Sequence, residues 1–454
     1  MLRAQEVAKD FPDVFRYDVW ITDLTGHLRI FSIKRLEPYH LEEGIGFDGS
    51  SVPYFGEVNS SDFIAKPDIS TLRVYPWLID GKKVAFAIAD IYEGFTLRRS
   101  PRDPRFVAQR LEDDLKRRGL KALVSAEVEF FLYEKDSKDF NSFLPIERKS
   151  GLIYAKNGYF QSPPIDQLYE YRTKLMETLE KLGLEPHKDH HEVAGGQMEI
   201  NIKADSPVRM SDKIQILKFA ARKVADQIKL LATFMPKPVS DDNGSGMHIH
   251  LSLWRGDKNL FYDEGDEYAE LSDIARYFIG GILEHAEALA AIIAPTVNSY
   301  KRLVPDYEAP VYICWGRKNR SAMIRIPLYY RRGSRQNAHR ARIEIRAPDP
   351  MANPYLAIPA LIYCGLDGID RKISPGDPID ENVYHLPREA RIELGIRELP
   401  RDLREALEYL ESDTFLRKVL GSELIDAYLE YKKEEWRAFM KTITPWEYER
   451  YFFA

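Results

Sequence analysis

Residues 122–133 have the sequence ALVSAEVEFFLY, and this run of apolar and aromatic side chains predicts a buried β-strand. Successive side chains in a strand alternate between its two faces, so Glu127 and Glu129 share one face. Two carboxylates that close repel each other unless a cation or an arginine neutralises them. The pair therefore indicates either a solvated strand face or part of a metal site.

Three other segments repeat this arrangement on predicted strands and the loops before them. They are residues 190–199 (HHEVAGGQME), 243–250 (NGSGMHIH) and 341–346 (ARIEIR). Each is a weak signal alone, because a single Glu or His in a strand is more often structural. Together they predict a sheet lined with polar groups that holds cations and anions, and carboxylates with one or two imidazoles favour Mg²⁺ or Mn²⁺.

Arginines follow in the next part of the chain. Arg320 and Arg325 bracket a short apolar run, which comes after a proline-punctuated segment, residues 299–310, that we expect to be a loop. Guanidinium groups suit phosphate and carboxylate oxygens. Surface ion pairs are the alternative interpretation for any one of these arginines.

Composition narrows the class of protein. The chain has 454 residues, a formal net charge of -6 and two cysteines, which disfavours a general nucleic-acid binder, a disulfide framework and a thiolate metal site. The N-terminus lacks an apolar secretory core, and residues 280–297 are interrupted by Glu284, His285 and Glu287, which favours a buried helix over a membrane span. We expect a cytoplasmic protein without nucleic-acid or membrane partners.

The first part of the chain is predicted to be strand-rich, with strands at residues 18–23, 28–33 and 83–90. Residues 44–71 are rich in Gly, Ser, Asp and Pro, which indicates a mobile or functional segment. The sequence SPRDP at residues 100–104 breaks the pattern. We therefore predict two domains, residues 1–100 and 101–454.

The second part alternates strands and helices. Strands are predicted at residues 192–203 and 247–254, and helices at residues 107–120, 167–182, 211–234 and 271–293. In the C-terminal tail Leu403, Leu407 and Leu410 are spaced to share one helix face. The predicted class is α+β, a small β domain followed by a large catalytic one.

Seven motifs occur in the order found in type I glutamine synthetases: GIGFDGSS (44–51), EVEF (127–130), GQME (196–199), NGSGMH (243–248), YKRLVP (300–305), NRS (319–321) and DPMANPYL (349–356). From about Gly44 onward the chain resembles that family. The resemblance implies an N-terminal β-grasp-like domain and a catalytic domain with a concave antiparallel sheet. It also implies ATP-dependent ligation of ammonia to the γ-carboxylate of L-glutamate through γ-glutamyl phosphate, giving L-glutamine, ADP and phosphate.

The resemblance also assigns roles by position. The metal ligands near glutamate are Glu129, Glu192 and Glu199, and those near the ATP phosphates are Glu127, His248 and Glu344. The glutamate-binding positions are Asn243, Gly244, Arg302 and Arg346. The phosphate-facing arginines are Arg320 and Arg325, and the nucleotide-side positions are His250, Ser252 and Arg342, with Arg325. The ammonium pocket is Asp48, Ser51, Tyr159, Glu192 and Glu308, with Asp48 as base and Glu308 on a closing loop.

The family implies two or more Mg²⁺ or Mn²⁺ ions per site, and a dodecamer of two stacked hexamers in which the Asp48 loop completes a neighbour's site. Glu57, His187 and His339 depart from common family residues, at positions linked to feedback inhibition and to ATP binding. The chain resembles the shorter branch without adenylylation control. Two alternatives stay open: a γ-glutamyl-amine ligase that uses an organic amine, and a non-catalytic regulatory relative.

Overall fold

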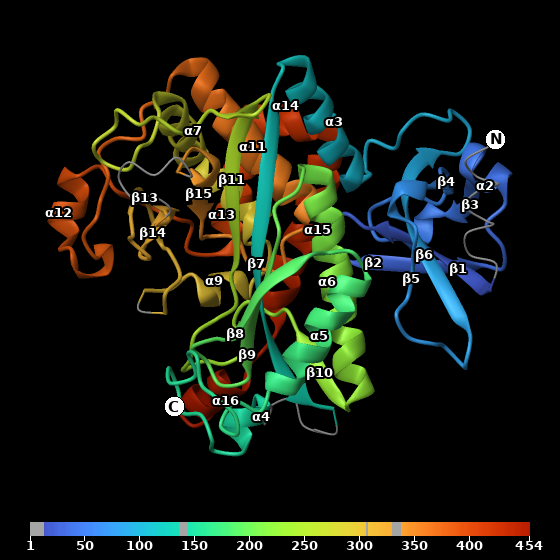
Figure 1. Cartoon of the computed structure of the whole chain (residues 1–454). Helices are drawn as coiled ribbons and strands as arrows, with labels where there is room; N and C mark the ends of the chain where they lie inside the picture. The colour runs from blue at the N-terminus through green and yellow to red at the C-terminus, as the bar shows by residue number, and fades with distance from the viewer. Residues whose placement is uncertain (1–12, 136–143, 306, 329–336) are drawn as a thin grey trace.

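The computed structural model describes residues 13–135, 144–305, 307–328 and 337–454. The N-terminal part forms a six-stranded sheet in the order β2-β1-β6-β4-β3, with β5 on β6 (Figure 1). Strands β1 and β6 pair in parallel at its centre, and the other described pairs are antiparallel. The strands are β1 (Val14–Thr22), β2 (Leu28–Ile33), β3 (Ile45–Asp48), β4 (Asp62–Pro67), β5 (Arg73–Val74) and β6 (Lys83–Glu93).

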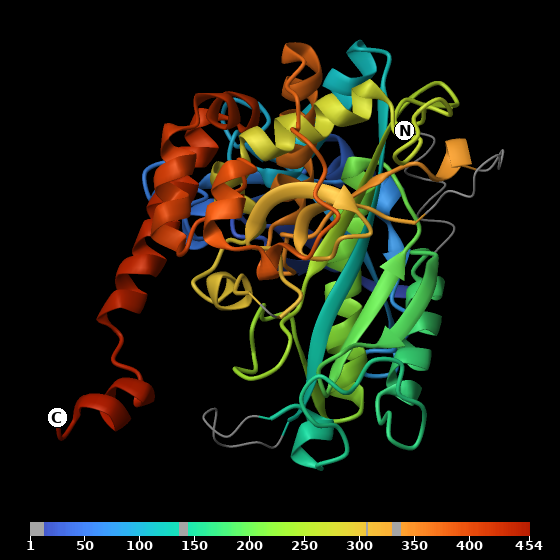
Figure 2. The ribbon, with the colours of Figure 1, turned by 90° about the vertical axis from the view of Figure 1, so that its left-hand side faces the viewer.

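The large part is built on a ten-stranded sheet in the order β16-β13-β14-β15-β11-β7-β9-β8, with β10 on β7 and β12 on β11. Its described pairs are antiparallel except β13 with β14, which run parallel. The sheet bends, so that β13 and β14 run in a different direction from the long strand β7 (Figure 2). The strands are β7 (Lys121–Glu134), β8 (Pro186–His191), β9 (Gln197–Ile202), β10 (Leu230–Thr233), β11 (Met247–Arg255), β12 (Lys258–Asn259), β13 (Tyr312–Arg317), β14 (Ala322–Ile326), β15 (Ile343–Ile345) and β16 (Arg397–Glu398).

Helices pack around this sheet and supply most of the core. Those that precede β13 are α2 (Pro38–Glu42), α3 (Pro104–Arg117), α4 (Ile146–Lys149), α5 (Tyr169–Lys181), α6 (Pro207–Gln227), α7 (Asp273–Glu284), α8 (Ala286–Ile293) and α9 (Ser299–Arg302). Those that follow are α10 (Asn337–Arg340), α11 (Pro354–Arg371), α12 (Arg388–Glu393), α13 (Leu403–Ser412), α14 (Thr414–Leu420), α15 (Ser422–Lys441) and α16 (Pro445–Tyr451). Leu403, Leu407 and Leu410 are buried on α13, as their spacing predicts.

The segment at residues 44–71, which the sequence indicates to be mobile or functional, holds β3, β4 and two short 3₁₀ turns, Gly49–Ser51 and Ile69–Thr71. Two predicted helices differ from the structure. The helix expected at residues 211–234 ends at Gln227, because the chain turns back to pair β10 with β7. The helix expected at residues 271–293 is divided at His285, whose ring bonds to two carboxylates.

The small sheet is fixed to the large part through a buried junction. The Trp20 ring of β1 meets Phe219 of α6 edge-on, with ring centroids 4.7 Å apart. Arg105, near the start of α3, forms ion pairs with Asp68 and Asp90 of the small part and with Asp212 of α6. This junction holds the two parts in one orientation.

At the other end of the chain, the C-terminal end of α15 and the whole of α16 lead away from the body of the molecule (Figure 2). This arm carries exposed apolar side chains: Met440, Ile443, Trp446, Tyr448, Tyr451, Phe452 and Phe453. Within the described ranges, every helix is too short or too polar to cross a membrane.

Candidate active site

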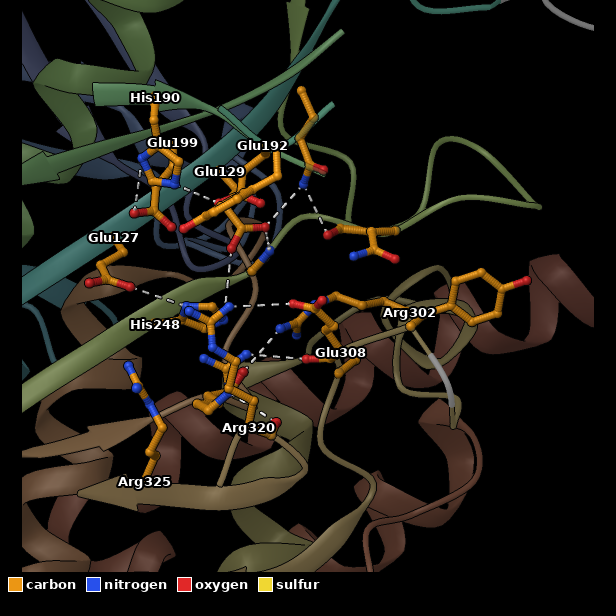
Figure 3. Close-up of a pocket in the computed structure, with 18 of the residues that line it drawn as sticks. Glu127, Glu129, His190, Glu192, Glu199, His248, Arg302, Glu308, Arg320 and Arg325 are labelled. Atoms are coloured by element: carbon orange, nitrogen blue, oxygen red, sulfur yellow. Dashed lines mark hydrogen bonds and ion pairs between the residues drawn. The ribbon is translucent and has the colours of Figure 1, made fainter. Parts of the chain in front are cut away.

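One face of the large sheet carries a polar cleft. Carboxylates and imidazoles from β7, β8, β9 and β11 line one side of it, and arginines together with Glu308 line the other (Figure 3). Thirteen of the predicted site residues lie here: Glu127, Glu129, Tyr159, Glu192, Glu199, Asn243, Gly244, His248, Arg302, Glu308, Arg320, Arg325 and Arg346.

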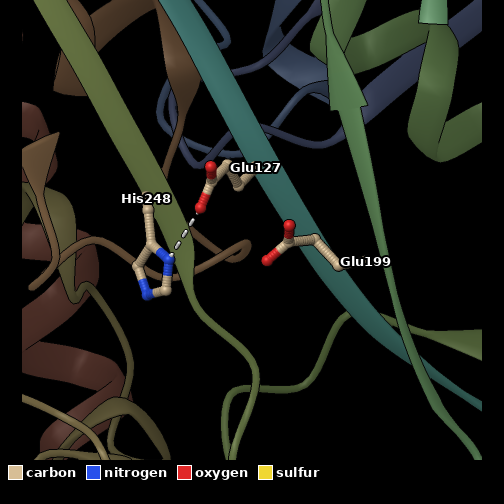
Figure 4. A group of neighbouring side chains, drawn as sticks. All are labelled: Glu127, Glu199 and His248. Carbon is tan, nitrogen blue, oxygen red and sulfur yellow. Dashed lines mark hydrogen bonds and ion pairs between the residues drawn. The ribbon is translucent and has the colours of Figure 1, made fainter. Parts of the chain in front are cut away.

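Strand register gathers the acidic side chains. Glu127 stands opposite His248 across β7 and β11, and Glu129 stands opposite Glu199 across β7 and β9. His248 Nδ1 lies 3.4 Å from Glu127 Oε2, and its Nε2 lies 3.8 Å from Glu129 Oε1. Glu127, Glu199 and His248 point toward one another from three strands (Figure 4). The shared face predicted for Glu127 and Glu129 is therefore the face of the cleft.

The carboxylates of this cluster lack enough positive charge to offset one another. Burial and the Glu192 carboxylate raise the pKa of Glu129 to about 8. Burial, together with Glu127, Glu192 and Glu129, raises the pKa of Glu199 well above its usual value. Burial and Arg346 lower the pKa of His248 to about 4, so its imidazole is neutral and free to ligate a metal. A cation bound here would remove the repulsion.

Three sets of side chains in and beside the cleft offer ligand atoms within 4.8 Å of one another. They are Glu127, Glu199 and His248; Glu127, His250 and Glu344; and His190, Glu192 and Glu199. This grouping differs from the two predicted triads and adds His190, whose Nε2 lies 2.8 Å from Glu192 Oε1. The buried His190 Nδ1 has no hydrogen-bond partner in the described part of the chain and lies 3.9 Å from Glu199. These oxygen and imidazole donors fit Mg²⁺ or Mn²⁺.

The opposite side of the cleft is basic. Arg346 Nη1 lies 2.7 Å from Glu344 Oε1, and Arg325 pairs with the other oxygen of the same carboxylate. Arg302 is buried and donates to the Ala347 carbonyl (2.8 Å). Arg320 is half exposed, and its Nη1 lies 3.7 Å from Glu308 Oε2, so it is free to turn toward a ligand.

Two positions that line the cleft are glycines because neighbouring atoms leave no room for a Cβ atom there. A Cβ on Gly244 would meet the Pro236 carbonyl oxygen at 2.3 Å, and a Cβ on Gly246 would meet the His248 ring at 2.7 Å. Without side chains, the Gly246 N–H donates to Glu129 (2.8 Å) and the Gly244 carbonyl accepts from Gln197 (3.1 Å). The loop thus positions Glu129 from the backbone.

A second cleft shares Glu127 with the first. It contains the predicted nucleotide-side residues His250, Ser252 and Arg342. His250 Nε2 lies 3.0 Å from Glu127 Oε1, and Arg342 Nε donates to His250 Nδ1 (3.3 Å). The unusual residues His187 and His339 line the same cleft, and His339 stacks on Trp254 with ring centroids 6.0 Å apart.

Asp48 and Ser51 are absent from the described lining of either cleft and belong to the small sheet and the turn after it. The Asp48 carboxylate is fully exposed and accepts from Ser50 and from the Ser51 hydroxyl (2.7 Å). These hydrogen bonds lower the pKa of Asp48, which keeps it ionised. Within one chain, therefore, these two residues do not join the other predicted site residues.

The structure adds residues that the sequence argument did not assign. Gln197 donates to Glu129 Oε2 (3.0 Å), and Lys188 and Tyr307 also line the cleft. Gln197 comes two positions before Glu199 in the motif GQME, so the two side chains share one face of the strand, and this spacing could have indicated Gln197 as a site residue. The sequence gives no such signal for Tyr307, because its ring contacts lysines that are distant in the sequence and that only the fold brings close.

Comparisons with known proteins agree with this geometry. The family model described as "Glutamine synthetase, beta-Grasp domain" matches residues 13–94, and the one described as "Glutamine synthetase, catalytic domain" matches residues 101–451. The expected β-grasp domain and large α+β catalytic domain are thereby confirmed, with a sheet that is mixed rather than wholly antiparallel.

Among relatives, the chain is 46% identical to a glutamine synthetase of Archaeoglobus fulgidus, over 95% of this chain and 93% of the relative. It is 44% identical to one of Sulfolobus acidocaldarius, over 92% and 91%. A solved structure described as "GmaS/ADP complex-Conformation 1" matches with a TM-score of 0.87 and 30% identity over the whole of both chains. The Plasmodium falciparum glutamine synthetase matches with a TM-score of 0.86 and 28% identity, over 99% and 98%. The chain therefore belongs to the glutamine synthetase family.

Proposed function

We propose that this chain joins ammonia to the γ-carboxylate of L-glutamate at the expense of ATP, giving L-glutamine, ADP and phosphate. The observation that carries the proposal is the cleft itself, where a carboxylate cluster short of positive charge faces a group of arginines. Such a cleft suits a reaction that brings two anions, a phosphate and a carboxylate, into contact. The names of the close relatives support the same activity.

Mg²⁺ or Mn²⁺, two or more ions per site, is our proposal for the metal. The ligands would come from Glu127, Glu129, Glu192, Glu199, His248 and Glu344, with His190 as a further donor. Bound there, the ions would neutralise phosphate charge and polarise the phosphoryl group. The negative charge of the carboxylate cluster would in turn offset the positive charge of the ions.

For the first step we propose that Arg302, Arg346, Asn243 and Gly244 bind glutamate and that Arg320 and Arg325 face the transferred phosphate. A γ-carboxylate oxygen attacks the γ-phosphorus of ATP, and the bond to ADP breaks. His250, Ser252 and Arg342 in the adjoining cleft would hold the nucleotide, which agrees with the ADP named for the GmaS complex. Glu127 lines both clefts, so the phosphates would lie where they meet.

In the second step ammonia attacks the acyl carbon and phosphate leaves. Ammonium prevails at neutral pH, so a base must take one proton before the attack and another group must take a second after it. We propose Asp48 for the first role and Glu308 for the second, with Ser51, Tyr159 and Glu192 completing the ammonium pocket. Because γ-glutamyl phosphate hydrolyses in water, closure around Glu308 would protect it.

Asp48 is remote from the cleft within one chain, so this role requires a second subunit. We propose a dodecamer of two stacked hexamers in which the Asp48 turn of one subunit closes the cleft of the next. The exposed apolar arm formed by α15 and α16 supports assembly, because a patch of that kind is usually covered in an oligomer.

We further propose domain limits of 1–100 and 101–454 and a cytoplasmic location. The break at residues 100–103, where Asp103 caps α3, supports the boundary. Both cysteines, Cys314 and Cys364, are free and buried, as suits a reducing compartment.

The experiment that tests the proposal gives the purified protein ATP, Mg²⁺ and glutamate, with ammonium or a panel of small amines. We expect glutamine from ammonium with one phosphate released per glutamine, identified by mass spectrometry. Preferential formation of a γ-glutamylated amine would instead support the amine ligase. Absence of turnover with every acceptor would support a non-catalytic relative.

A further inference from the structure

Glu308 is held over the cleft mainly through its neighbours, not through its own side chain. Its carboxylate and Arg320, 3.7 Å away, are both about half exposed, and such pairs fix geometry weakly. Its backbone has φ of +57°, a left-handed conformation that a residue without special support seldom keeps. Something else must therefore set the position of this carboxylate.

Three contacts anchor the short segment at residues 307–310, here called the Glu308 segment. The Glu308 carbonyl accepts from Arg346 Nη2 (3.3 Å), and the Ala309 carbonyl accepts from the Tyr384 hydroxyl (2.7 Å). The third contact is the Tyr307 ring, with Lys237 Nζ at 3.6 Å and Lys156 Nζ at 4.5 Å from its centroid. Tyr307 is the anchor next to Glu308 on the N-terminal side.

The Lys237 ammonium is well placed to bind an aromatic ring tightly. Only 7% of Lys237 is exposed, and cation–π attraction is strongest when the cation is desolvated. Burial lowers the pKa of Lys237 to about 8, so the group still carries its charge at neutral pH. Its Nζ donates to the Asp242 carbonyl, and its backbone N–H donates to Asn298 Oδ1 (2.7 Å).

Asp242 connects the lysines to the cleft. Its buried Oδ1 accepts from the backbone N–H of Lys156 and from that of Asn243, each at 3.0 Å, and its Oδ2 pairs with Arg148 (3.0 Å). Lys156 lies three positions before Tyr159, and Asn243 follows Asp242 directly. Asp242 thus contacts Lys237 through its backbone carbonyl, and through its carboxylate it holds the backbone of Lys156 and of Asn243, in two loops beside the cleft.

From these contacts we infer that Tyr307 is a positioning residue: its ring, held by the ammonium groups of Lys156 and Lys237, sets the Glu308 carboxylate over the cleft. This inference rests on the proposed function for its catalytic consequence. If Glu308 accepts a proton from the ammonia adduct and excludes water, a loose Tyr307 leaves the acyl phosphate open to hydrolysis. Water then replaces ammonia at the acyl carbon, so ADP and phosphate form without glutamine.

The test compares Tyr307→Leu and Lys237→Met with the conservative Tyr307→Phe, which keeps the aromatic face. A matched control is Lys82→Met, which removes a cation–π contact of 4.0 Å with Phe15 in the small sheet. We expect Tyr307→Leu and Lys237→Met to raise the KM for ammonium roughly tenfold and to lower the glutamine formed per ADP. Tyr307→Phe and Lys82→Met should stay within twofold of the parent protein.

A second measurement does not depend on turnover. Hydrogen exchange of the peptide that contains the Glu308 segment should quicken in Tyr307→Leu and in Lys237→Met, and stay unchanged in Tyr307→Phe. Unchanged exchange together with an unchanged glutamine-to-ADP ratio in Tyr307→Leu would overturn the inference. Loss of thermal stability with that ratio intact would also overturn it, because it would show a structural role alone. If the parent protein makes no glutamine, the proposed function fails, and the exchange result still decides whether Tyr307 anchors the segment.

Discussion

Two buried charge clusters in this molecule differ in whether each carboxylate is paired with an arginine. At the junction between the small and large parts, Arg105 pairs with Asp212, Asp68 and Asp90, and Tyr355 donates a further hydrogen bond to Asp212 (2.6 Å). Burial by itself would lower the pKa of Arg105, but Asp212 raises this pKa above its ordinary value. The guanidinium group therefore keeps its charge.

In and beside the cleft this pairing is incomplete among the described residues. Glu344 is paired with Arg346 and Arg325, but the pKa values of Glu129 and Glu199 are raised by burial and by neighbouring carboxylates. A buried cluster whose carboxylates are each paired with an arginine fixes the position of the chain, whereas one with unpaired carboxylates is suited to bind a cation. The junction cluster therefore has a structural role and the cleft cluster a binding role, and this follows without any knowledge of the substrate.

The largest effect is expected from Arg105→Met at the junction. The variant leaves Asp212 buried without its cation, so the free energy of unfolding should fall by about 3 to 5 kcal/mol. Urea denaturation checks this. The control is Arg118→Met, whose pair with Asp370 (2.9 Å) is exposed on both sides and should cost less than about 1 kcal/mol. Equal losses in the two variants would contradict the distinction between the clusters.

Glu129→Gln should have the opposite effect to Arg105→Met, with a large loss of activity and no loss of stability. Glutamine keeps an acceptor oxygen for the N–H of Gly246 and cannot ionise beside Glu192, so stability without metal should be unchanged or higher. Glutamine synthesis should fall by roughly 100-fold or more if Glu129 is the metal ligand that we propose. Steady-state rates and thermal unfolding with and without Mg²⁺ measure both effects. A variant stabilised by Mg²⁺ as much as the parent would remove Glu129 from the ligand set.

Asp48→Ala tests a charge that lies outside both clusters. We expect turnover at limiting ammonium to fall roughly 100-fold, as for loss of a general base, while the effect of Mg²⁺ on thermal unfolding stays as in the parent. Co-expression with Glu129→Gln subunits is the sharper measurement. If each site combines two subunits, mixed assemblies should regain about a quarter of parental activity, since a random mixture pairs intact halves that often. No recovery in mixed assemblies would place Asp48 outside a shared site.

The sequence predicted the centre of the fold more accurately than its periphery. The strand at residues 122–133 and the facing of Glu127 and Glu129 follow from alternation and are found in β7. The parallel pairing of β13 with β14 and the break at His285 depend on tertiary contacts that no local pattern encodes. For the same reason the motifs predicted the cleft residues but not Tyr307, whose partners are at positions 156 and 237.

The smallest expected effect is that of His285 on the free energy of unfolding, and it is tested by varying the pH. Its Nδ1 lies 2.7 Å from Asp413 and its Nε2 lies 3.1 Å from Asp367, which also pairs with Arg371, so this cluster is balanced when the ring is protonated. Burial opposes protonation, but Asp413 and Asp367 raise the pKa of His285 above its ordinary value. A raised folded-state pKa contributes stability that is complete below about pH 6.5 and is lost as pH rises through the folded value. Relative to His285→Gln, the parent protein should therefore lose at most about 1 kcal/mol of unfolding free energy between pH 6 and 9, after allowance for partial solvent exposure. Urea denaturation across that range measures it, and a constant difference between the two proteins would show that the ring stays neutral and that its cluster, like the cleft, lacks internal balance.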